Sequence, residues 1–264
     1  MPSQAQSSCP SPVQWDERLL AVLTLPLFLL RAVQTKPCEG EAVVLLHGLS
    51  RNYFAMKPLA KRLHARGFHV VNISYPSHLA DIPTLIGKYI LPEIEKLGDR
   101  RIHFVTHSLG GILVRWLLKN EPPANPGRLV MLAPPNQGNE IVDRLGKKTW
   151  FPLLMGSAAM QLGTDGIPKK LGAVPIPACV VMGRRAVVPF FRGWHEGEGD
   201  GFVGVAGGHA PGVDASHVIE ADHTFIMMHP EAIRIAIEFL ESSAPKRSLQ
   251  PSPAPEGIPQ ADFG

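Results

Sequence analysis

Residues 104–111, F-V-T-H-S-L-G-G, constrain the fold of this chain more than any other stretch. Apolar or β-branched residues end a buried strand at Thr106, and apolar residues at helical spacing follow the stretch. A strand that turns directly into a helix at Ser108 puts this serine at strained backbone angles, with its hydroxyl exposed. Such a turn needs small residues two positions before and after the serine. Gly110 meets this need, and Thr106 stands where glycine is commoner. The alternative is an ordinary junction that Ser108 caps.

The composition indicates a globular protein without a nucleic-acid partner. The 264 residues suffice for one large or two small domains, and the 19% of charged residues leave ample apolar material for a core. The formal net charge is only +3, and no basic stripe is present. Cys179 is expected to be a free buried thiol, and a disulfide between Cys9 and Cys38 is left open. Because no phosphate-binding loop, dinucleotide fingerprint or metal-ligand cluster occurs, we expect no cofactor and no metal.

The two ends of the chain differ from its middle. Residues 1–40 are predicted to form an N-terminal tail with an apolar helix or anchor, because residues 19–30 carry no charge. This segment is short for a membrane span. A helix packed on the domain, a membrane-surface anchor and the remnant of an export signal all remain open. The compartment is therefore cytoplasmic, membrane-associated or exported. Residues 242–264, rich in proline and serine, are predicted to form a C-terminal tail.

Between these ends, residues 41–241 alternate between strand and helix patterns. Short apolar runs predict strands at 42–46, 68–75, 101–106, 128–132, 178–182 and 217–220. Helical spacing predicts helices at 56–66, 81–97 with a kink at Pro92, 109–118 and 229–240. This alternation predicts an α/β domain with a mostly parallel central sheet and helices on both faces. Residues 136–177 are the candidate for a small cap over the sheet.

Candidate reactive side chains follow the predicted strands. Residues 47–49, H-G-L, follow the first strand, and Ser108 follows the third. Asp200 and His223 follow the last two strands. Because ligands bind outside the carboxyl ends of parallel strands, we expect these residues to meet at one edge of the sheet.

The order Ser, Asp, His on separate strands resembles the α/β-hydrolase superfamily, specifically its small bacterial-type serine esterases and lipases. The resemblance covers roughly residues 40–240. It is carried by five motifs, H-G, T-H-S-L-G-G, M-L-A-P-P-N-Q-G, D-G-F-V and D-H-T-F. It implies a catalytic triad in which Ser108 is the nucleophile, His223 the general base and Asp200 the carboxylate that orients it. It also implies an oxyanion hole formed by the backbone N–H groups of Leu49 and Leu109.

Other histidines and aspartates compete for these roles. We interpret His47 as shaping its loop and His107, beside Ser108, as structural. The remaining competitors lie in the last third of the chain and are His209, His217, His229, Asp214 and Asp222.

Aromatic residues near the predicted site suggest an apolar substrate pocket. Tyr53 and Phe54 lie beyond the oxyanion loop, and Phe190 and Phe191 precede Asp200. Together with Gly48, these residues are predicted to contact the substrate. We expect hydrolysis of carboxylic esters with short to medium acyl chains.

Several alternatives to this activity stay open. They are a lipase acting on longer acyl glycerides, a thioesterase or amidase with the same triad, and a non-catalytic binding protein. The expected partner is a small ester or lipid, and residues 19–30 could add a membrane surface. The sequence leaves the oligomeric state open.

Overall fold

A computed structural model describes residues 32–186 and 197–242 of the chain. Several sequence predictions therefore lie outside the described residues. They concern Cys9, the apolar segment 19–30, Phe190, Phe191 and the C-terminal tail from residue 243 onward.

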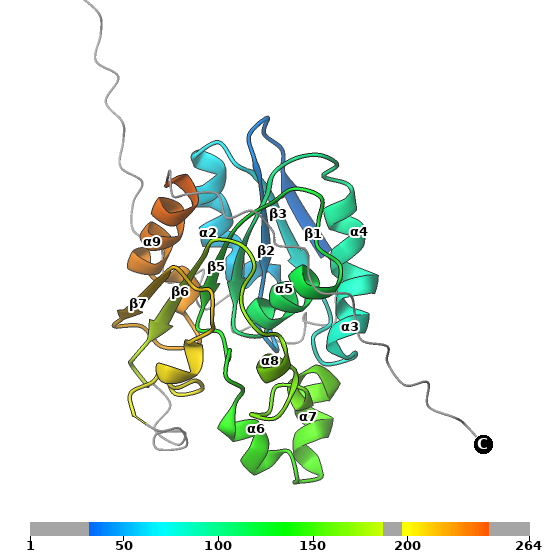
Figure 1. Ribbon diagram of the computed structural model, residues 1–264, viewed down its shortest axis with the longest axis vertical. Helices are drawn as coiled ribbons and strands as arrows, with labels where there is room; N and C mark the ends of the chain where they lie inside the picture. Colours follow the sequence, from blue (N-terminus) through cyan, green and yellow to red (C-terminus); the bar gives the residue numbers. More distant parts are fainter. Residues whose placement is uncertain (1–31, 187–196, 243–264) are drawn as a thin grey trace, which may run out of the picture.

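A seven-stranded sheet forms the centre of the molecule (Figure 1), with the strand order β1-β3-β2-β4-β5-β6-β7. The strands are β1 (Ala32–Lys36), β2 (Ala42–Leu46), β3 (His69–Ser74), β4 (Ile102–His107), β5 (Pro126–Leu132), β6 (Ala178–Gly183) and β7 (Ala215–Ile219). All neighbours pair in parallel except β1, which runs antiparallel to β3. The central strands β2, β4 and β6 are buried along their whole length, as expected for parallel strands covered on both faces.

Strand β1 corrects the sequence analysis, which assigned all of residues 1–40 to a tail and an apolar segment. Residues 32–36, A-V-Q-T-K, pair with β3 at the edge of the sheet. An edge strand has a partner on one side only and is half exposed, so it carries polar residues such as Gln34 and Thr35. The run therefore lacks the apolar pattern by which the other strands were predicted.

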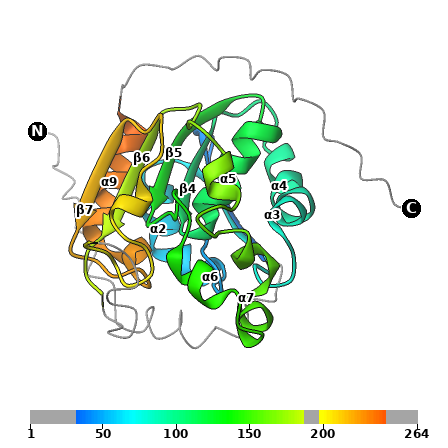
Figure 2. The same cartoon turned by 60° about the horizontal axis from the view of Figure 1, so that its bottom comes forward.

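Helices cover both faces of the sheet, as Figures 1 and 2 show. One face packs against α2 (Tyr53–Ala65) and α9 (Pro230–Glu241), with the short 3₁₀ turn η5 (Ile226–Met228) between them. The other face packs against α5 (Leu109–Asn120) and a helical stretch made of α3 (Ile82–Leu85), η2 (Ile86–Ile90) and α4 (Leu91–Glu95). Two apolar cores therefore hold the sheet between layers.

The helical stretch is irregular directly before Pro92, where the sequence predicts a kink. Segment η2 is wound as a π-helix, and Pro92 stands in the first turn of α4 directly after it. Proline has no N–H to donate into the preceding turn, so the helix changes its hydrogen-bond pattern where Pro92 enters.

Residues 136–177 contain three short helices near the carboxyl ends of the strands, α6 (Glu140–Leu145), α7 (Trp150–Met160) and α8 (Ile167–Lys170). Helix α7 kinks at Gly156, where φ is 78° and a Cβ would lie 2.1 Å from the carbonyl oxygen of His78. Trp150, Leu153 and Leu154 of α7 are exposed. These helices occupy the segment for which the sequence predicts a small cap, and the longest of them, α7, is apolar and kinked.

Residues 32–186 and 197–242 lack two features. No helix in them is both long and apolar enough to cross a membrane. They also contain no cluster of three or more His, Cys, Asp or Glu side chains arranged to hold a metal ion.

Candidate active site

Ser108 occupies the turn between β4 and α5 with unusual backbone angles, φ 50° and ψ −119°. Few residues other than glycine adopt a positive φ, and such a conformation costs about 1–3 kcal/mol unless the surrounding structure enforces it. The Ser108 N–H donates to the carbonyl oxygen of Leu132 at 2.9 Å, and its own carbonyl accepts from the Gly111 N–H at 2.9 Å. Its side chain does not cap the helix. The strained turn that the sequence predicts is therefore present.

The small residues around Ser108 allow helix α5 to lie directly against strand β2. A Cβ added to Gly110 would lie 2.6 Å from the carbonyl oxygen of Leu46 and 3.0 Å from that of His47. No side chain fits in this space. Thr106 is fully buried, and its hydroxyl donates to the carbonyl oxygen of Val130 at 3.3 Å. Threonine is tolerated here because its hydroxyl has a backbone acceptor.

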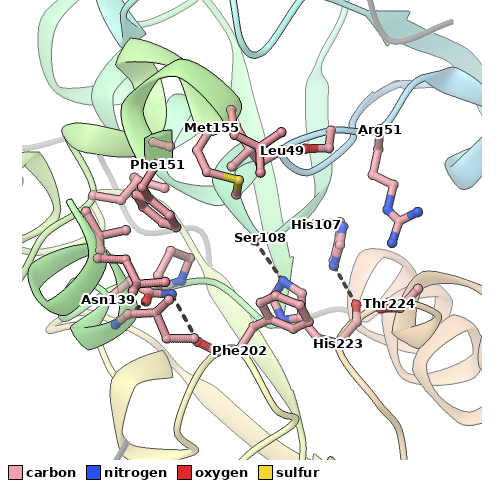
Figure 3. A pocket seen from close by; sticks show the side chains of 18 of the residues that line it. Leu49, Arg51, His107, Ser108, Asn139, Phe151, Met155, Phe202, His223 and Thr224 are labelled. Carbon is pink, nitrogen blue, oxygen red and sulfur yellow. Dashed lines mark hydrogen bonds between the residues drawn. The ribbon is translucent and has the colours of Figure 1, made fainter. Parts of the chain in front are cut away.

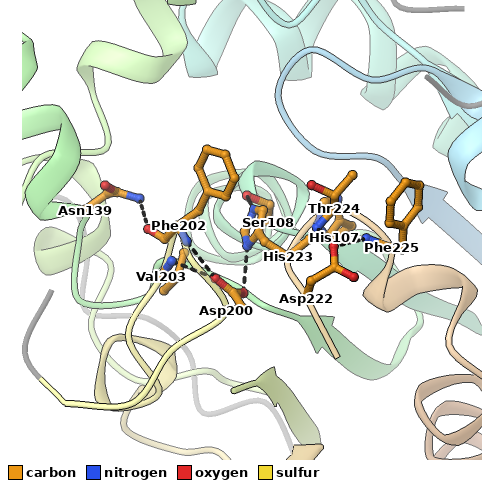
Figure 4. A network of polar contacts seen from close by, with 10 residues as sticks. All are labelled: His107, Ser108, Asn139, Asp200, Phe202, Val203, Asp222, His223, Thr224 and Phe225. Carbon is orange, nitrogen blue, oxygen red and sulfur yellow. Dashed lines mark hydrogen bonds and ion pairs between the residues drawn. The ribbon is translucent and has the colours of Figure 1, made fainter. Parts of the chain in front are cut away.

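Ser108, His223 and Asp200 form a hydrogen-bonded chain (Figure 4). The Ser108 hydroxyl lies 3.0 Å from Nε2 of His223, and Nδ1 of His223 lies 2.8 Å from Oδ2 of Asp200. The other carboxylate oxygen, Oδ1, accepts from the N–H groups of Phe202 and Val203 at 3.0 and 2.8 Å. The carboxylate is fully buried, whereas 12% of the His223 side chain is exposed. Asp200 and His223, which lie 92 and 115 positions after Ser108 in the sequence, are thus brought together with its hydroxyl by the fold.

The competing aspartates lie in other hydrogen bonds. Oδ2 of Asp214 accepts from the N–H of Ala178 at the start of β6. Oδ1 of Asp222 accepts from the N–H groups of Thr224 and Phe225, which closes the turn after His223. Neither carboxylate is hydrogen-bonded to the His223 ring.

The side chain of His107 is hydrogen-bonded to the backbone of His223. Its Nε2–H donates to the carbonyl oxygen of His223 at 2.9 Å, and the two rings lie 5.0 Å apart. Burial holds the pKa of His107 well below its usual value, so the ring is neutral. The interpretation of His107 as structural agrees with this contact, although His107 also lines the cavity described below.

His47 shapes the loop after β2. Its Nδ1–H donates to the carbonyl oxygen of Gly48 at 2.8 Å, and its Nε2 accepts from the Tyr75 N–H at 3.2 Å. The two rings stack at 4.1 Å, and the Tyr75 hydroxyl donates to the His47 carbonyl oxygen. Complete burial lowers the pKa of His47 to about 4. Gly48 packs on His107, because a Cβ there would lie 2.6 Å from His107 Nδ1.

Two backbone N–H groups lie beside Ser108 without an acceptor. Leu109 is the first residue of α5, where no intrahelical acceptor exists for its N–H. Within the part of the chain that the structure describes, neither Leu49 nor Leu109 donates its N–H to another residue. Both groups are therefore free to donate to a bound oxygen atom.

A cavity of about 390 Å³ opens over Ser108 (Figure 3). Its lining is mainly apolar and comes in large part from the inner sides of α6 and α7, for example Ile141, Phe151 and Met155. Among the predicted site residues, Ser108, His223 and Leu49 line the cavity. The volume lies within the range of small-molecule sites.

Several lining residues were missed in the sequence, and three predicted substrate contacts, Gly48, Tyr53 and Phe54, are not among the described residues that line the cavity. Tyr53 and Phe54 stack on each other at the start of α2, with their ring centroids 4.4 Å apart, and are not among the described residues that line the cavity. Arg51, Phe151 and Phe202 do line it. The apolar residues of the 136–177 segment could have indicated in the sequence that this segment lines the cavity. No sequence pattern around Arg51 identifies it as a lining residue.

Asn139 was also missed, because its role depends on two loops meeting. Its Oδ1 caps α6 by accepting from the Ile141 N–H at 2.9 Å. Its Nδ2 donates to the carbonyl oxygen of Phe202 at 3.0 Å (Figure 4). Phe202 follows Asp200 and Gly201 in the loop that carries the carboxylate, which we call the acid loop.

The fold agrees with the comparisons to known proteins. The mature lipase BlEst2 of Bacillus licheniformis superposes with a TM-score of 0.62 and 19% identity, over 79% of this chain and 98% of that chain. An esterase from Exiguobacterium antarcticum superposes with a TM-score of 0.56 and 15% identity, over 80% and 96%. At these identities the likeness shows the fold, and it confirms the predicted α/β-hydrolase architecture.

Sequence comparison adds a relative and a family. Lysosomal thioesterase PPT2-B of Xenopus laevis is 30% identical over 153 residues, which are 53% of this chain and 51% of that protein. The match therefore spans about half the length of this relative. The family model described as "Alpha/beta hydrolase family" matches residues 43–236, most of the described chain. The chain therefore belongs to the alpha/beta hydrolase family.

Proposed function

We propose that this protein is a serine hydrolase that cleaves carboxylic esters through an acyl-enzyme intermediate. The observation that carries the proposal is the position of His223, hydrogen-bonded both to the Ser108 hydroxyl and to the buried Asp200 carboxylate. A serine hydroxyl is a weak nucleophile at neutral pH and needs such a base to take its proton.

In the proposed acylation step, Oγ of Ser108 attacks the carbonyl carbon of the ester while Nε2 of His223 takes the hydroxyl proton. The carbonyl oxygen becomes an oxyanion that accepts from the N–H groups of Leu49 and Leu109. The tetrahedral intermediate then collapses, and His223 returns the proton to the departing alcohol. Water attacks the acyl-serine by the same steps and releases the acid.

Asp200 would orient His223 during both steps. Its Oδ2 accepts from Nδ1–H of His223, which keeps Nε2 free to act as the base. Its Oδ1 is held by two backbone N–H groups, so the carboxylate is fixed before the substrate binds. Its negative charge stabilises the imidazolium that forms in each transition state.

The apolar part of the cavity is the proposed site for the acyl chain. Phe151 and Met155 from the cap face the Ser108 side of the cavity (Figure 3). Burying methylene groups against these side chains favours an alkyl chain over a polar one, by about 0.8 kcal/mol for each methylene. We expect short to medium chains to be the best substrates, with longer acyl glycerides as the nearest variant.

Thioester hydrolysis is the second candidate, and the similarity to a protein named as a lysosomal thioesterase favours it. The same nucleophile and oxyanion donors would serve, because a thioester presents the same carbonyl group. Matched oxygen esters and thioesters of one acyl chain separate the two candidates.

The first test compares the parent with Ser108→Ala on p-nitrophenyl esters of increasing acyl length, acyl thioesters and anilides. The substitution should lower kcat on the order of 10⁶-fold while the far-ultraviolet circular dichroism and Tm stay unchanged. A fluorophosphonate probe should label the parent at Ser108 and leave the variant unlabelled. Ester hydrolysis by Ser108→Ala near the parent rate would refute the proposed nucleophile, and an unlabelled, inactive parent would favour a non-catalytic binding protein.

A further inference from the structure

We infer that Arg51 binds an anionic oxygen group, a phosphate, carried by the alcohol or thiol part of the substrate. This inference rests on the proposed function and adds the chemical class of the leaving group. The substrates it describes are acyl esters or thioesters that are apolar at one end and negatively charged at the other.

Arg51 lies at the polar end of the cavity (Figure 3). It follows Leu49 and Ser50 in the loop between β2 and α2. A hydrogen bond between Ser50 Oγ and His78 Nε2, at 2.8 Å, stabilises this loop. In the figure the guanidinium lies on the side of His107 and Thr224. Phe151 and Met155 lie on the opposite side of Ser108.

Arg51 carries the only permanent charge among the described residues that line the cavity. The other lining residues are apolar, neutral polar or histidine. A guanidinium in such a place loses part of its hydration, and burial accordingly lowers the pKa of Arg51. A cation that is partly desolvated gains more from an anionic partner than a cation on the open surface does.

No carboxylate among the described residues lies within 4.0 Å of the Arg51 guanidinium. Asp222 is the acidic side chain that raises the pKa of Arg51, and it acts over a longer distance. Its Oδ1 is already engaged with the N–H groups of Thr224 and Phe225. The donors of Arg51 are therefore available to a ligand, and a guanidinium suits the paired oxygens of a phosphate.

The proposed chemistry assigns the two ends of the cavity to the two parts of the substrate. The acyl chain occupies the side lined by the cap, so the alcohol or thiol leaves on the other side. This is the side of Thr224 and His223, and His223 must reach the leaving oxygen or sulfur to protonate it. Arg51 stands beside this exit (Figure 3) and can hold the phosphate of a glycerol phosphate ester, which lies a few bonds beyond the leaving oxygen. In an acyl-coenzyme A the nearest phosphate lies at the far end of the pantetheine arm, so it reaches Arg51 only if this arm folds back.

Two sources of such a phosphate are chemically distinct, and the test includes both. One is the thiol of an acyl-coenzyme A, and the other is the glycerol phosphate part of an acylated phospholipid. Each anionic substrate is paired with a neutral one of the same acyl chain. Octanoyl-coenzyme A is compared with octanoyl-N-acetylcysteamine, and octanoylglycerol phosphate is compared with octanoylglycerol.

The variants are Arg51→Gln, Arg51→Lys and Arg66→Gln, each measured for kcat and KM on all four substrates. Arg66 is the matched control, because it lies exposed just after α2 and pairs with Glu241 away from the cavity. In Arg51→Gln, the ratio of kcat/KM for the anionic substrate to that for its neutral partner should fall roughly 10- to 100-fold. The loss should lie mainly in KM, since the phosphate is bound equally in the ground and transition states. Arg51→Lys should retain part of the ratio.

A binding measurement separates this inference from the proposed function. Calorimetry with Ser108→Ala and octanoylglycerol phosphate does not require turnover, and adding Arg51→Gln should weaken the affinity at least tenfold. Unchanged ratios and unchanged affinity in Arg51→Gln would overturn the inference, even with ester hydrolysis intact. Equal losses on anionic and neutral substrates, together with a lower Tm, would also overturn it and assign Arg51 to holding the Asp222 turn.

Discussion

At the scale of single residues, the candidate site depends on side chains held in conformations that isolated peptides would avoid. Ser108 keeps a positive φ because its N–H is bonded to Leu132 and because helix α5 packs on β2 through Gly110. The carboxylate of Asp200 is buried yet receives three hydrogen bonds, which offset the loss of its hydration. Contacts made by neighbouring backbone thus hold both the hydroxyl and the carboxylate in position.

Replacing the buried carboxylate tests which acid serves His223. Asp200→Asn should lower kcat on the order of 10⁴-fold, because an amide can donate to His223 Nδ1 and thereby stabilise the tautomer that cannot accept the Ser108 proton. Steady-state kinetics on one p-nitrophenyl ester checks this. Asp214→Asn and Asp222→Asn are the matched controls. If one of these variants lost activity while Asp200→Asn stayed active, that aspartate would be the carboxylate that serves His223.

At the scale of elements, the cap and the loop that carries Asp200 are joined. Asn139 caps α6 with one side-chain atom and donates to Phe202 with the other. Just before it, Gln137 donates its backbone N–H to Gly207 and its side-chain Nε2 to His209. The start of the cap segment therefore lies fixed on the acid loop, so that displacing one displaces the other.

Asn139→Asp separates the two functions of this side chain. An aspartate can still cap α6, but it cannot donate to the Phe202 carbonyl oxygen. We expect a loss of about 1 kcal/mol in unfolding free energy and a severalfold lower kcat/KM, larger for long acyl chains than for short ones. Denaturant unfolding and an ester chain-length series measure the two effects. Asn125→Asp, which removes a loop bond to Asp99 far from the cavity lining, is the control. Parent-like values in Asn139→Asp would show that the cap and the acid loop are not coupled.

At the scale of the whole molecule, several histidines are folded into the core in the neutral form. Burial lowers the pKa values of His47, His103 and His107. The His47 ring also makes two hydrogen bonds, one at Nδ1 and one at Nε2, that require its neutral form. Protonation of His47 at Nε2 would abolish the bond from the Tyr75 N–H. At mildly acidic pH the folded protein therefore binds fewer protons than the unfolded chain does.

Acid should consequently destabilise the protein before its carboxylates are protonated. Between pH 6.5 and about 4 the unfolded chain protonates His47 while the folded chain does not, so unfolding free energy falls as pH falls through this window. His47 alone contributes about 3 kcal/mol to this loss. Denaturant unfolding at pH 8, 6 and 4 measures it, and His47→Asn should make the dependence shallower. The same pH dependence in parent and variant would assign the effect to other groups.

Local patterns in the amino-acid sequence were sufficient to predict much of the fold. The apolar run 42–46, the turn at Ser108 and the alternation of strands and helices lead to a parallel sheet, because each depends on residues adjacent in the chain. The edge strand β1 escaped this reasoning, since an edge strand needs no continuous apolar run.

Which of these residues meet depends on how the loops pack in the folded domain. The D-G-F-V motif favours Asp200 over Asp214 and Asp222 only through a family resemblance, and the hydrogen bond of Asp200 to His223 forms only once the loops are folded. Arg51 reaches the cavity, whereas the aromatic residues Tyr53 and Phe54, two positions farther along, do not line it. The physical reason is that a side chain's role at a sheet edge depends on where separate loops converge, and this is set by the packing of the whole domain.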